Sequence, residues 1–356
     1  MNTSTSNHID QLLINSGLFP IKKTHHEELN NFDFSNDVIL ITGAAGSIGS
    51  ELSKQLLACR YKRLILVDVA ESPLYDLIKD LEFENTENVD FLLLNIIEEP
   101  TLRHLFETYK PTLIFHSAAY KHVPLMEANP YEAVKLNIFG TKLLADLSTE
   151  HDVKKFIFIS TDKAVNPVSV MGMSKRIAEN YLDHISSGSK TQFTITRFGN
   201  ILGSNGSVLP LFKKQIESGM PITITNKAIS RYFINKNKAC TLILEIATFN
   251  KDESNTYTFN MGDPIKIIDL AKRVIVLYNA VNKSIDIKIT GLRPGEKLHE
   301  DIVSKHETLI STKNESILLV KPNNNLETSK INFSELAAIT PNMPNPEVKS
   351  ILKKYV

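Results

Sequence analysis

A cluster of polar, proton-carrying residues follows one of the most apolar stretches of the chain. The run FIFIS ends at Ser160 and continues directly into Thr161, Asp162 and Lys163. An aspartate and a lysine side by side have different proton affinities, so one can donate a proton while the other accepts one. The same residues could merely cap the next segment. Their place at the carboxyl end of a predicted strand, where α/β sheets bind ligands, favours an acid–base role.

A glycine-rich turn follows the first apolar run. VILIT leads into Gly43, Gly46 and Gly49, and a helical pattern comes next. Glycines at such a turn let the backbone approach a pyrophosphate at a helix N-terminus. The next apolar run ends about 20 residues later in Asp68, where an acid binds the adenosine ribose and repels a 2′-phosphate. A tight turn without a ligand would look similar, but the combination with Asp68 predicts dinucleotide binding, with NAD favoured over NADP.

Short apolar runs alternate along the chain with stretches of helical period. VILIT, RLILVD, FLLLN, TLIFHSA and FIFIS are apolar throughout, as expected for strands covered on both faces. They predict an α/β fold with a Rossmann-type, doubly wound parallel sheet, and the turn-rich sequence after Arg197 predicts a smaller C-terminal lobe. We expect an N-terminal extension with one short helix near Ile9 to Ile14 (1–36), an NAD-binding domain (37–200), a partly interleaved substrate-binding lobe (201–330) and a C-terminal tail (331–356).

Composition and charge exclude several classes of function. The 356 residues are 42% hydrophobic and 22% charged, which is typical of a globular protein with a main domain and a smaller lobe. With 40 basic and 40 acidic residues, no overall field attracts nucleic acid or an anionic membrane. Cys59 and Cys240 form no pair motif and the histidines lack ligand spacing, so neither a disulfide nor a metal site is predicted. Without a leader or a membrane span of roughly 20 apolar residues, we expect a cytoplasmic protein.

Longer sequence segments indicate a more specific class of enzyme. The turn has the spacing TGxxGxxG, and the chain contains SAAYKHVPLMEANPYEAVKLNIFGT, STDKAVNPVSVMGMSKRIAE, TRFGNILGSNGSVLPLFKKQI and GLRPGEKLHE. From roughly Val38 to Val303, these segments resemble in their order the UDP-N-acetylglucosamine 4,6-dehydratases of bacterial capsule, O-antigen and protein-glycan pathways. That family belongs to the extended branch of the short-chain dehydrogenase/reductases. The resemblance implies NAD as cofactor, a UDP-N-acetylhexosamine as substrate and a homo-oligomer.

The resemblance also implies roles at the reacting sugar. Thr161 would bond the carbon 4 oxygen, Asp162 would protonate the leaving carbon 6 hydroxyl, and Lys163 would take the carbon 5 proton. Most of the superfamily has a tyrosine four residues before a helical lysine, but here Met171 precedes Lys175. Methionine carries no transferable proton, so we expect apolar packing from Met171 and ribose contact from Lys175. If Lys163 both removes and returns the proton, the configuration at carbon 5 is retained.

Further residues are expected to hold the two ligands. Arg231 and Arg293 could clamp phosphate oxygens, and Glu296 could accept from uridine ribose hydroxyls. His122, beside Lys121, has a residue type that is more often structural at such a position, and it is not assigned to the site. The expected substrate-binding residues are Lys121, Asn200, Ser207, Arg231, Arg293 and Glu296. The expected cofactor-binding residues are Gly43, Gly46, Ser47, Ile48, Gly49, Asp68, Asn95, Ile96, Ala118, Ala119 and Lys175.

Three other functions stay open from the sequence. A 4,6-dehydratase that inverts carbon 5 would need a second proton donor across the ring. A sugar-nucleotide 4-epimerase shares the fold and the oxidation step but needs the tyrosine base. A non-catalytic NAD-binding scaffold would be expected to lose Asp162, Lys163 and the RPGEK segment, which are intact. The acid–base pair therefore favours a lyase that uses NAD catalytically and returns the hydride to carbon 6.

Overall fold

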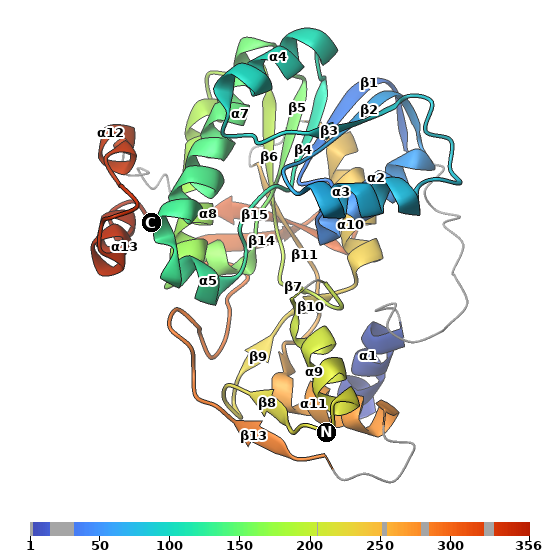
Figure 1. Ribbon diagram of the computed structural model, residues 1–356, viewed down its shortest axis with the longest axis vertical. Helices are drawn as coiled ribbons and strands as arrows, with labels where there is room; N and C mark the ends of the chain where they lie inside the picture. Colours follow the sequence, from blue (N-terminus) through green and yellow to red (C-terminus); the bar gives the residue numbers. More distant parts are fainter. Residues whose placement is uncertain (1–2, 15–31, 205, 251–254, 279–284, 324–330) are drawn as a thin grey trace.

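The predicted strands form one nine-stranded sheet at the centre of the protein (Figure 1). The structure is a computed structural model that describes residues 3–14, 32–204, 206–250, 255–278, 285–323 and 331–356. The strands of this sheet are β1 (Asp33–Thr42), β2 (Arg60–Asp68), β3 (Val89–Leu93), β4 (Leu113–His116), β5 (Lys155–Ile159), β6 (Gln192–Arg197), β11 (Thr256–Phe259), β14 (Glu307–Ser311) and β15 (Ile317–Pro322). Their order is β14-β15-β11-β6-β5-β4-β1-β2-β3. All pairs from β3 to β11 are parallel, and β15 and β14 add antiparallel pairs at one edge.

Alternate side chains of β1 enter two hydrophobic cores, which explains why the strand sequences are apolar throughout. Ile39 and Ile41 belong to one core, and Val38 and Leu40 belong to the other. The first face is covered by α2 (Ser47–Leu57), α3 (Glu71–Asp80) and α10 (Lys236–Thr248). The second face is covered by α4 (Glu99–Tyr109), α7 (Thr141–Glu150) and α8 (Val170–Ser186). The expectation of a doubly wound α/β sheet is confirmed.

The strand order reverses at β1, which lies between β2 and β4. Connections on the two sides of such a switch point diverge, and the crevice between them is where doubly wound sheets bind ligands. Short helices follow β4 and β5 at this edge. They are α5 (Val123–Ala128), α6 (Pro130–Ala133), the π-helix η2 (Val134–Gly140) and the 3₁₀ turn η3 (Asp162–Ala164).

A smaller lobe lies beyond the carboxyl ends of the parallel strands, in the lower part of Figure 1. It contains α9 (Val208–Glu217), α11 (Ile267–Tyr278) and the strand pairs β8 (Ile222–Ile224) with β13 (Ile287–Ile289), and β9 (Ser230–Arg231) with β12 (Ile265–Lys266). The pair β7 (Asn200–Ile201) with β10 (Phe233–Ile234) joins it to the main domain. The interval 201–330 also supplies α10, β11, β14 and β15 to the main domain, so the two parts are interleaved.

Part of the expected N-terminal extension, residues 3–14, is helical, and residues 15–31 lie outside the described ranges. The helix expected near Ile9 to Ile14 is α1 (Thr3–Ile14), and its Ile9 and Leu13 are buried in the core of the lobe. Asp10 forms an ion pair with Arg273 of α11. Strand β1 begins at Asp33 rather than after Asn36, with an irregular step in its pairing before Val38.

The C-terminal segment, expected only as a tail, contains α12 (Phe333–Ala337) and α13 (Asn345–Lys353). Leu336, Val348 and Leu352 are buried in a core shared with Met173 and Ile177 of α8. Figure 1 shows these two helices beside α8 on the flank of the main domain. Among the helices of the described ranges, none has the length and apolar character that crossing a membrane requires.

Candidate active site

A cleft of about 680 Å³ lies between the carboxyl ends of the parallel strands and the lobe. This volume lies within the ordinary range of small-molecule sites, about 300–1,000 Å³. The main domain contributes the segments after β1, β4 and β5, and the lobe contributes the start of α9 and the segment 290–300. Residues expected at the site that line the cleft are Gly46, Ser47, Ile48, Ala119, Lys121, Thr161, Lys163, Met171, Lys175, Asn200, Ser207, Arg231, Arg293 and Glu296.

The glycine turn at the start of α2 leaves no room for other residue types at two positions. Gly43 has φ +68°, and a Cβ there would lie 2.6 Å from the backbone nitrogen of Ala118. A Cβ on Gly49 would lie 2.1 Å from the carbonyl oxygen of Gly43. Backbone atoms form both barriers and cannot rotate away. The turn is therefore fixed by its sequence in a close approach between β1, β4 and α2.

Asp68 is held at the end of β2 by two backbone N–H groups. Its Oδ2 accepts from Ala45 at 2.9 Å, within the glycine turn, and its Oδ1 accepts from Ala70 at 2.9 Å. Asn95 and Ile96 follow the neighbouring strand β3, and the N–H of Leu94 donates to the Asp68 carbonyl. An oriented carboxylate beside a helix N-terminus fits the ribose and pyrophosphate of a dinucleotide.

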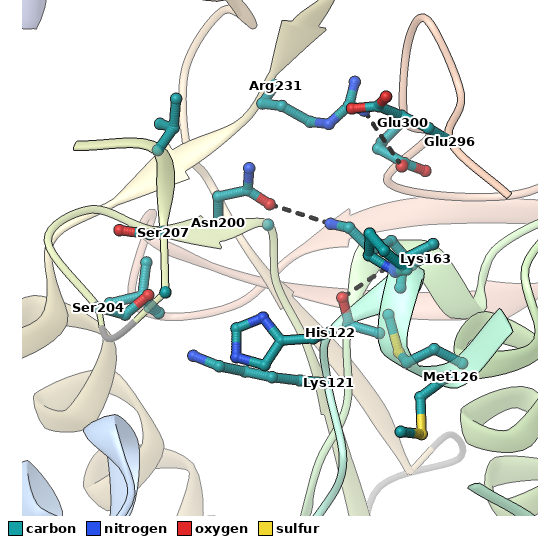
Figure 2. A pocket seen from close by; sticks show the side chains of 18 of the residues that line it. Lys121, His122, Met126, Lys163, Asn200, Ser204, Ser207, Arg231, Glu296 and Glu300 are labelled. Atoms are coloured by element: carbon teal, nitrogen blue, oxygen red, sulfur yellow. Dashed lines mark hydrogen bonds and ion pairs between the residues drawn. The ribbon is translucent and has the colours of Figure 1, made fainter. Parts of the chain in front are cut away.

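Three side chains after β5 form a connected triplet. Thr161 Oγ1 donates to Asp162 Oδ1 at 2.9 Å, and Lys163 Nζ donates to the same oxygen at 2.9 Å. Lys163 Nζ also donates to Asn200 Oδ1 at 3.0 Å, a contact drawn in Figure 2. Asp162 is 1% exposed, and its Oδ2 is buried without a hydrogen-bond partner among the described residues. The triplet can move protons along short contacts and has one carboxylate oxygen left to bind a donor.

A buried ionic network, whose residues were not among those expected from the sequence, lies behind this triplet. Arg197, at the end of β6, pairs with Glu179 of α8 at 2.8 Å and with Glu307 at 2.8 Å. Ser160 Oγ donates to Glu179 at 2.5 Å, so the network holds the strand end that carries Thr161. Burial lowers the pKa of Arg197, but the two carboxylates outweigh it and raise that pKa. A sequence signal was available in Glu179, which lies four residues after Lys175 on the same helix face.

Met171 and Lys175 are both buried on α8 and both line the cleft. Lys175 Nζ donates to the carbonyl of Ile159 at 2.6 Å. Burial lowers the pKa of Lys175 to about 7, although the charge of Glu179 opposes this shift. Met171 packs with Met126 and other apolar side chains. The pair therefore places an apolar surface and an amine of reduced basicity beside the triplet.

The lobe side of the cleft carries the expected sugar-nucleotide residues. Arg293 is largely exposed, and its backbone and guanidinium N–H groups donate to Glu296. Arg231 is buried, and its guanidinium donates to the carbonyls of Ser230, Lys297 and Leu298. These bonds fix the backbone of the segment that carries Glu296, whereas the sequence suggested a direct phosphate clamp.

Two further charged residues, Lys121 and Glu300, line the cleft. Desolvation lowers the pKa of Lys121, and the charge of Lys163 adds to that shift. Glu300 belongs to the RPGEKLHE segment but was not among the expected site residues. It lines the cleft and is 8% exposed. Within the described residues, no group of three or more His, Cys, Asp or Glu side chains could hold a metal ion.

The strand order, the glycine turn and the interleaved lobe define the extended short-chain dehydrogenase/reductase fold. Residues 39–322 match the family described as polysaccharide biosynthesis protein, and the chain belongs to that family. The resemblance seen in the sequence is thereby confirmed.

Individual relatives show how similar the chain is to other members of this family. The chain is 42% identical over 278 residues to the capsular polysaccharide biosynthesis protein CapD of Staphylococcus aureus, covering 77% of this chain and 46% of that protein. It thus spans about half the length of that relative. It is 31% identical over 306 residues to a UDP-N-acetylglucosamine 4,6-dehydratase (inverting) of Campylobacter jejuni, covering 85% and 87%. The solved structure of Pen from Bacillus thuringiensis matches with a TM-score of 0.73 and 29% identity, covering 83% and 90%.

Proposed function

We propose that the chain is an NAD-dependent sugar-nucleotide 4,6-dehydratase that acts on UDP-N-acetylglucosamine or a close UDP-N-acetylhexosamine. The observation that carries this proposal is the hydrogen-bonded triplet of Thr161, Asp162 and Lys163 at the cleft. The reaction converts the hexose into a 4-keto-6-deoxy sugar and releases one water molecule. A relative that the chain matches over 87% of its length is named for this activity.

The main-domain side of the cleft would hold NAD. Gly46 and Ser47 line the cleft at the start of α2, where a helix N-terminus favours a pyrophosphate. The oriented carboxylate of Asp68 suits the adenosine ribose, and Lys175 suits the nicotinamide ribose. When bound, NAD accepts a hydride from carbon 4 and supplies it to carbon 6, so the cofactor is regenerated in every cycle.

The triplet provides a path for the proton that the carbon 4 hydroxyl loses on oxidation. Thr161 Oγ1 already donates to Asp162 Oδ1, so it can take the proton of the sugar hydroxyl while passing its own to Asp162. Asp162 then protonates the carbon 6 hydroxyl, which leaves as water. The proton lost at oxygen 4 therefore leaves within the water molecule, and the step needs no external acid.

Lys163 would serve carbon 5. Once carbon 4 is a ketone, the carbon 5 proton is acidic, and the amine of Lys163 would be the base that accepts it as the carbon 6 hydroxyl leaves. After hydride addition at carbon 6, the same amine returns a proton to carbon 5. Met171 occupies the position of the tyrosine that takes the hydroxyl proton in most of the superfamily. The mechanism does not need that tyrosine, because Thr161 and Asp162 take the proton instead.

The lobe would hold the UDP part of the substrate. Arg293 is exposed at the cleft and suits the phosphate oxygens, and Glu296 suits the uridine ribose hydroxyls. Arg231 acts through the segment that it fixes. Asn200 and Ser207 complete this set, and the buried Oγ of Ser207 has no hydrogen-bond partner among the described residues.

We further propose that carbon 5 keeps its configuration, because one base, Lys163, both removes and returns the proton. In heavy water the product should then carry one deuterium at carbon 5 and keep its D configuration, which the ring-proton couplings in an NMR spectrum report. The Campylobacter jejuni relative is named as inverting, and inversion here would require a second donor across the ring. Lys121, with its lowered pKa, is the residue to test if the product has the L-arabino configuration.

The purified protein, incubated with UDP-N-acetylglucosamine and no added cofactor, tests the function. NMR of the product should show a UDP-4-keto-6-deoxy-N-acetylhexosamine. Formation of UDP-N-acetylgalactosamine would instead identify a 4-epimerase, and an unchanged substrate in the presence of protein-bound NAD would favour a binding protein.

A further inference from the structure

Glu300 is a buried carboxylate that has no role in the proposed mechanism. It lies in the segment that crosses from the lobe to β14, lines the cleft and is 8% exposed. Figure 2 shows it at the cleft beside Arg231, on the lobe side of Lys163. Buried carboxylates are rare in proteins unless donors surround them, so its environment requires an explanation.

The cations near Glu300 are already engaged with other partners. Arg231 approaches Glu300 Oε1 at 3.9 Å, and Lys297 approaches Oε2 at 3.8 Å, both beyond hydrogen-bond distance. Arg231 donates to backbone carbonyls of its own segment and of 297–298, and Lys297 donates to the carbonyl of Val165 at 3.0 Å. Glu300 Oε2 therefore remains buried without a hydrogen-bond partner among the described residues.

Glu300 lines the same cleft as Lys163, and Figure 2 shows both side chains there. Burial raises the pKa of Glu300, Lys163 opposes that shift and Asp162 adds to it, so the charges of the catalytic pair reach this carboxylate. Arg231 and Lys297 also lower its pKa. A carboxyl group accepts hydrogen bonds at its oxygens, and a hexose presents hydroxyl and amide N–H donors.

We propose that Glu300 is a specificity-determining residue that accepts a hydrogen bond from a hydroxyl or amide N–H of the hexose. The inference rests on the proposed function, since it takes the ligand to be a UDP-N-acetylhexosamine. A site with a buried acceptor rejects analogues that lack the matching donor, because they leave that acceptor unpaired. Glu300 thus selects the sugar, whereas Arg293 and Glu296 hold the nucleotide.

A thermodynamic cycle tests this contact by comparing the affinities of protein variants at residue 300 for substrate analogues that each lack one donor group. All proteins carry Thr161→Val, which blocks turnover so that the ligand stays intact during calorimetry. The ligands are UDP-N-acetylglucosamine and four analogues that each lack one donor: the acetamido group, the 3-hydroxyl, the 4-hydroxyl or the 6-hydroxyl. They are titrated into proteins with Glu300, Glu300→Ala or Glu300→Met. Asp301→Asn serves as the control, because it alters the adjacent, exposed carboxylate of the same segment.

With Glu300 present, one analogue should bind about 10- to 100-fold more weakly than the parent sugar, the loss expected when a buried acceptor is left unpaired. In Glu300→Ala that analogue and the parent should bind within about twofold of each other, while Asp301→Asn should behave like the unchanged protein. Equal losses with and without Glu300 for all four analogues would overturn the inference while leaving the proposed function intact. If Glu300→Ala loses its fold by circular dichroism, the same comparison is made with Glu300→Met, which keeps the side-chain length but has no strong acceptor. No binding of the parent sugar by the Glu300 protein would overturn both proposals.

Discussion

The two sides of the cleft differ in how completely their polar groups are paired. On the main-domain side, Asp68 receives two backbone hydrogen bonds, and the glycine turn is set by backbone contacts. On the opposite side, the carboxylate of Glu300 and the hydroxyl of Ser207 are buried without partners among the described residues. Asp162, in η3 on the main-domain side, is also without a hydrogen-bond partner among the described residues at one of its two oxygens.

This difference indicates two ways of building a binding surface. A cofactor that stays bound through every cycle can bind to a surface whose shape is fixed by the backbone and whose polar groups are already paired. A substrate that enters and leaves can supply the missing hydrogen bonds itself, and its departure leaves those groups unpaired again. We therefore expect substitutions at the paired side to affect cofactor retention, and substitutions at the unpaired side to affect turnover and sugar selection.

The largest expected effect is at the catalytic pair. Asp162→Asn and Lys163→Ala should each lower turnover by roughly 10²–10⁴-fold, the usual contribution of a general acid or base. Both act after the cofactor is bound, so NAD content, measured by mass spectrometry of the denatured protein, should not change. A loss below about tenfold in both variants would remove these residues from their roles.

At the paired side, Gly49→Ala should abolish retention of NAD through purification. Its new Cβ would meet the carbonyl oxygen of Gly43 at 2.1 Å and the Cα of Ala44 at 2.7 Å, so the turn itself must move. Gly188→Ala is the matched control, because a Cβ there meets nothing within 4 Å. The recovered cofactor should be NAD, and recovery of NADP instead would contradict the role of Asp68. Full NAD content in Gly49→Ala would show that the turn is not the cofactor site.

The burial of Lys175 predicts that the stability of the folded protein depends on pH. The folded-state pKa is about 7 against an ordinary 10.5, so between these values the unfolded chain binds a proton that the folded chain does not. Stability of the nucleotide-free protein should therefore rise with pH across that window. Lys175→Met should be most stabilising, relative to the parent, near pH 7, and this gain should shrink toward pH 10. Urea unfolding at several pH values measures it, and a gain independent of pH would contradict the lowered pKa.

The smallest effect is expected at Met171. Met171→Ala should reduce turnover by less than about tenfold, because a thioether carries no proton to transfer and contributes packing alone. Steady-state kinetics beside Asp162→Asn gives the comparison. A loss as large as that of Asp162→Asn, in a folded variant that still contains NAD, would mean that the proton path through Thr161 is incomplete.

Features encoded in short segments could be predicted from the sequence. The apolar runs, the glycine turn and Asp68 depend on local backbone geometry, and Thr161 to Lys163 follow a strand whose end must face the ligand crevice. Glu300 could not be singled out, because its burial and missing partner arise from segments that are distant in sequence. Arg197 likewise has partners from α8 and β14, so the only local signal of its network was Glu179, four residues after Lys175.

The C-terminal helices show another limit of the sequence pattern. The sequence after Lys321 is rich in Asn and Pro and suggested only a tail, but α12 and α13 bury Leu336 and Leu352 in a core shared with α8. Helices of this length gain most of their stability from packing, so their own sequence carries only a weak signal. Interactions over long sequence separation therefore account for most of what the pattern did not reveal.

The central claim is that the hydride taken from carbon 4 is returned to carbon 6 of the same sugar. UDP-N-acetylglucosamine labelled with deuterium at carbon 4 tests it directly when the product is examined by NMR and mass spectrometry. The account predicts a 4-keto-6-deoxy product with the label at carbon 6. Label remaining at carbon 4 of an epimerised sugar, or a 4-keto-6-deoxy product that has lost the label to solvent, would contradict it.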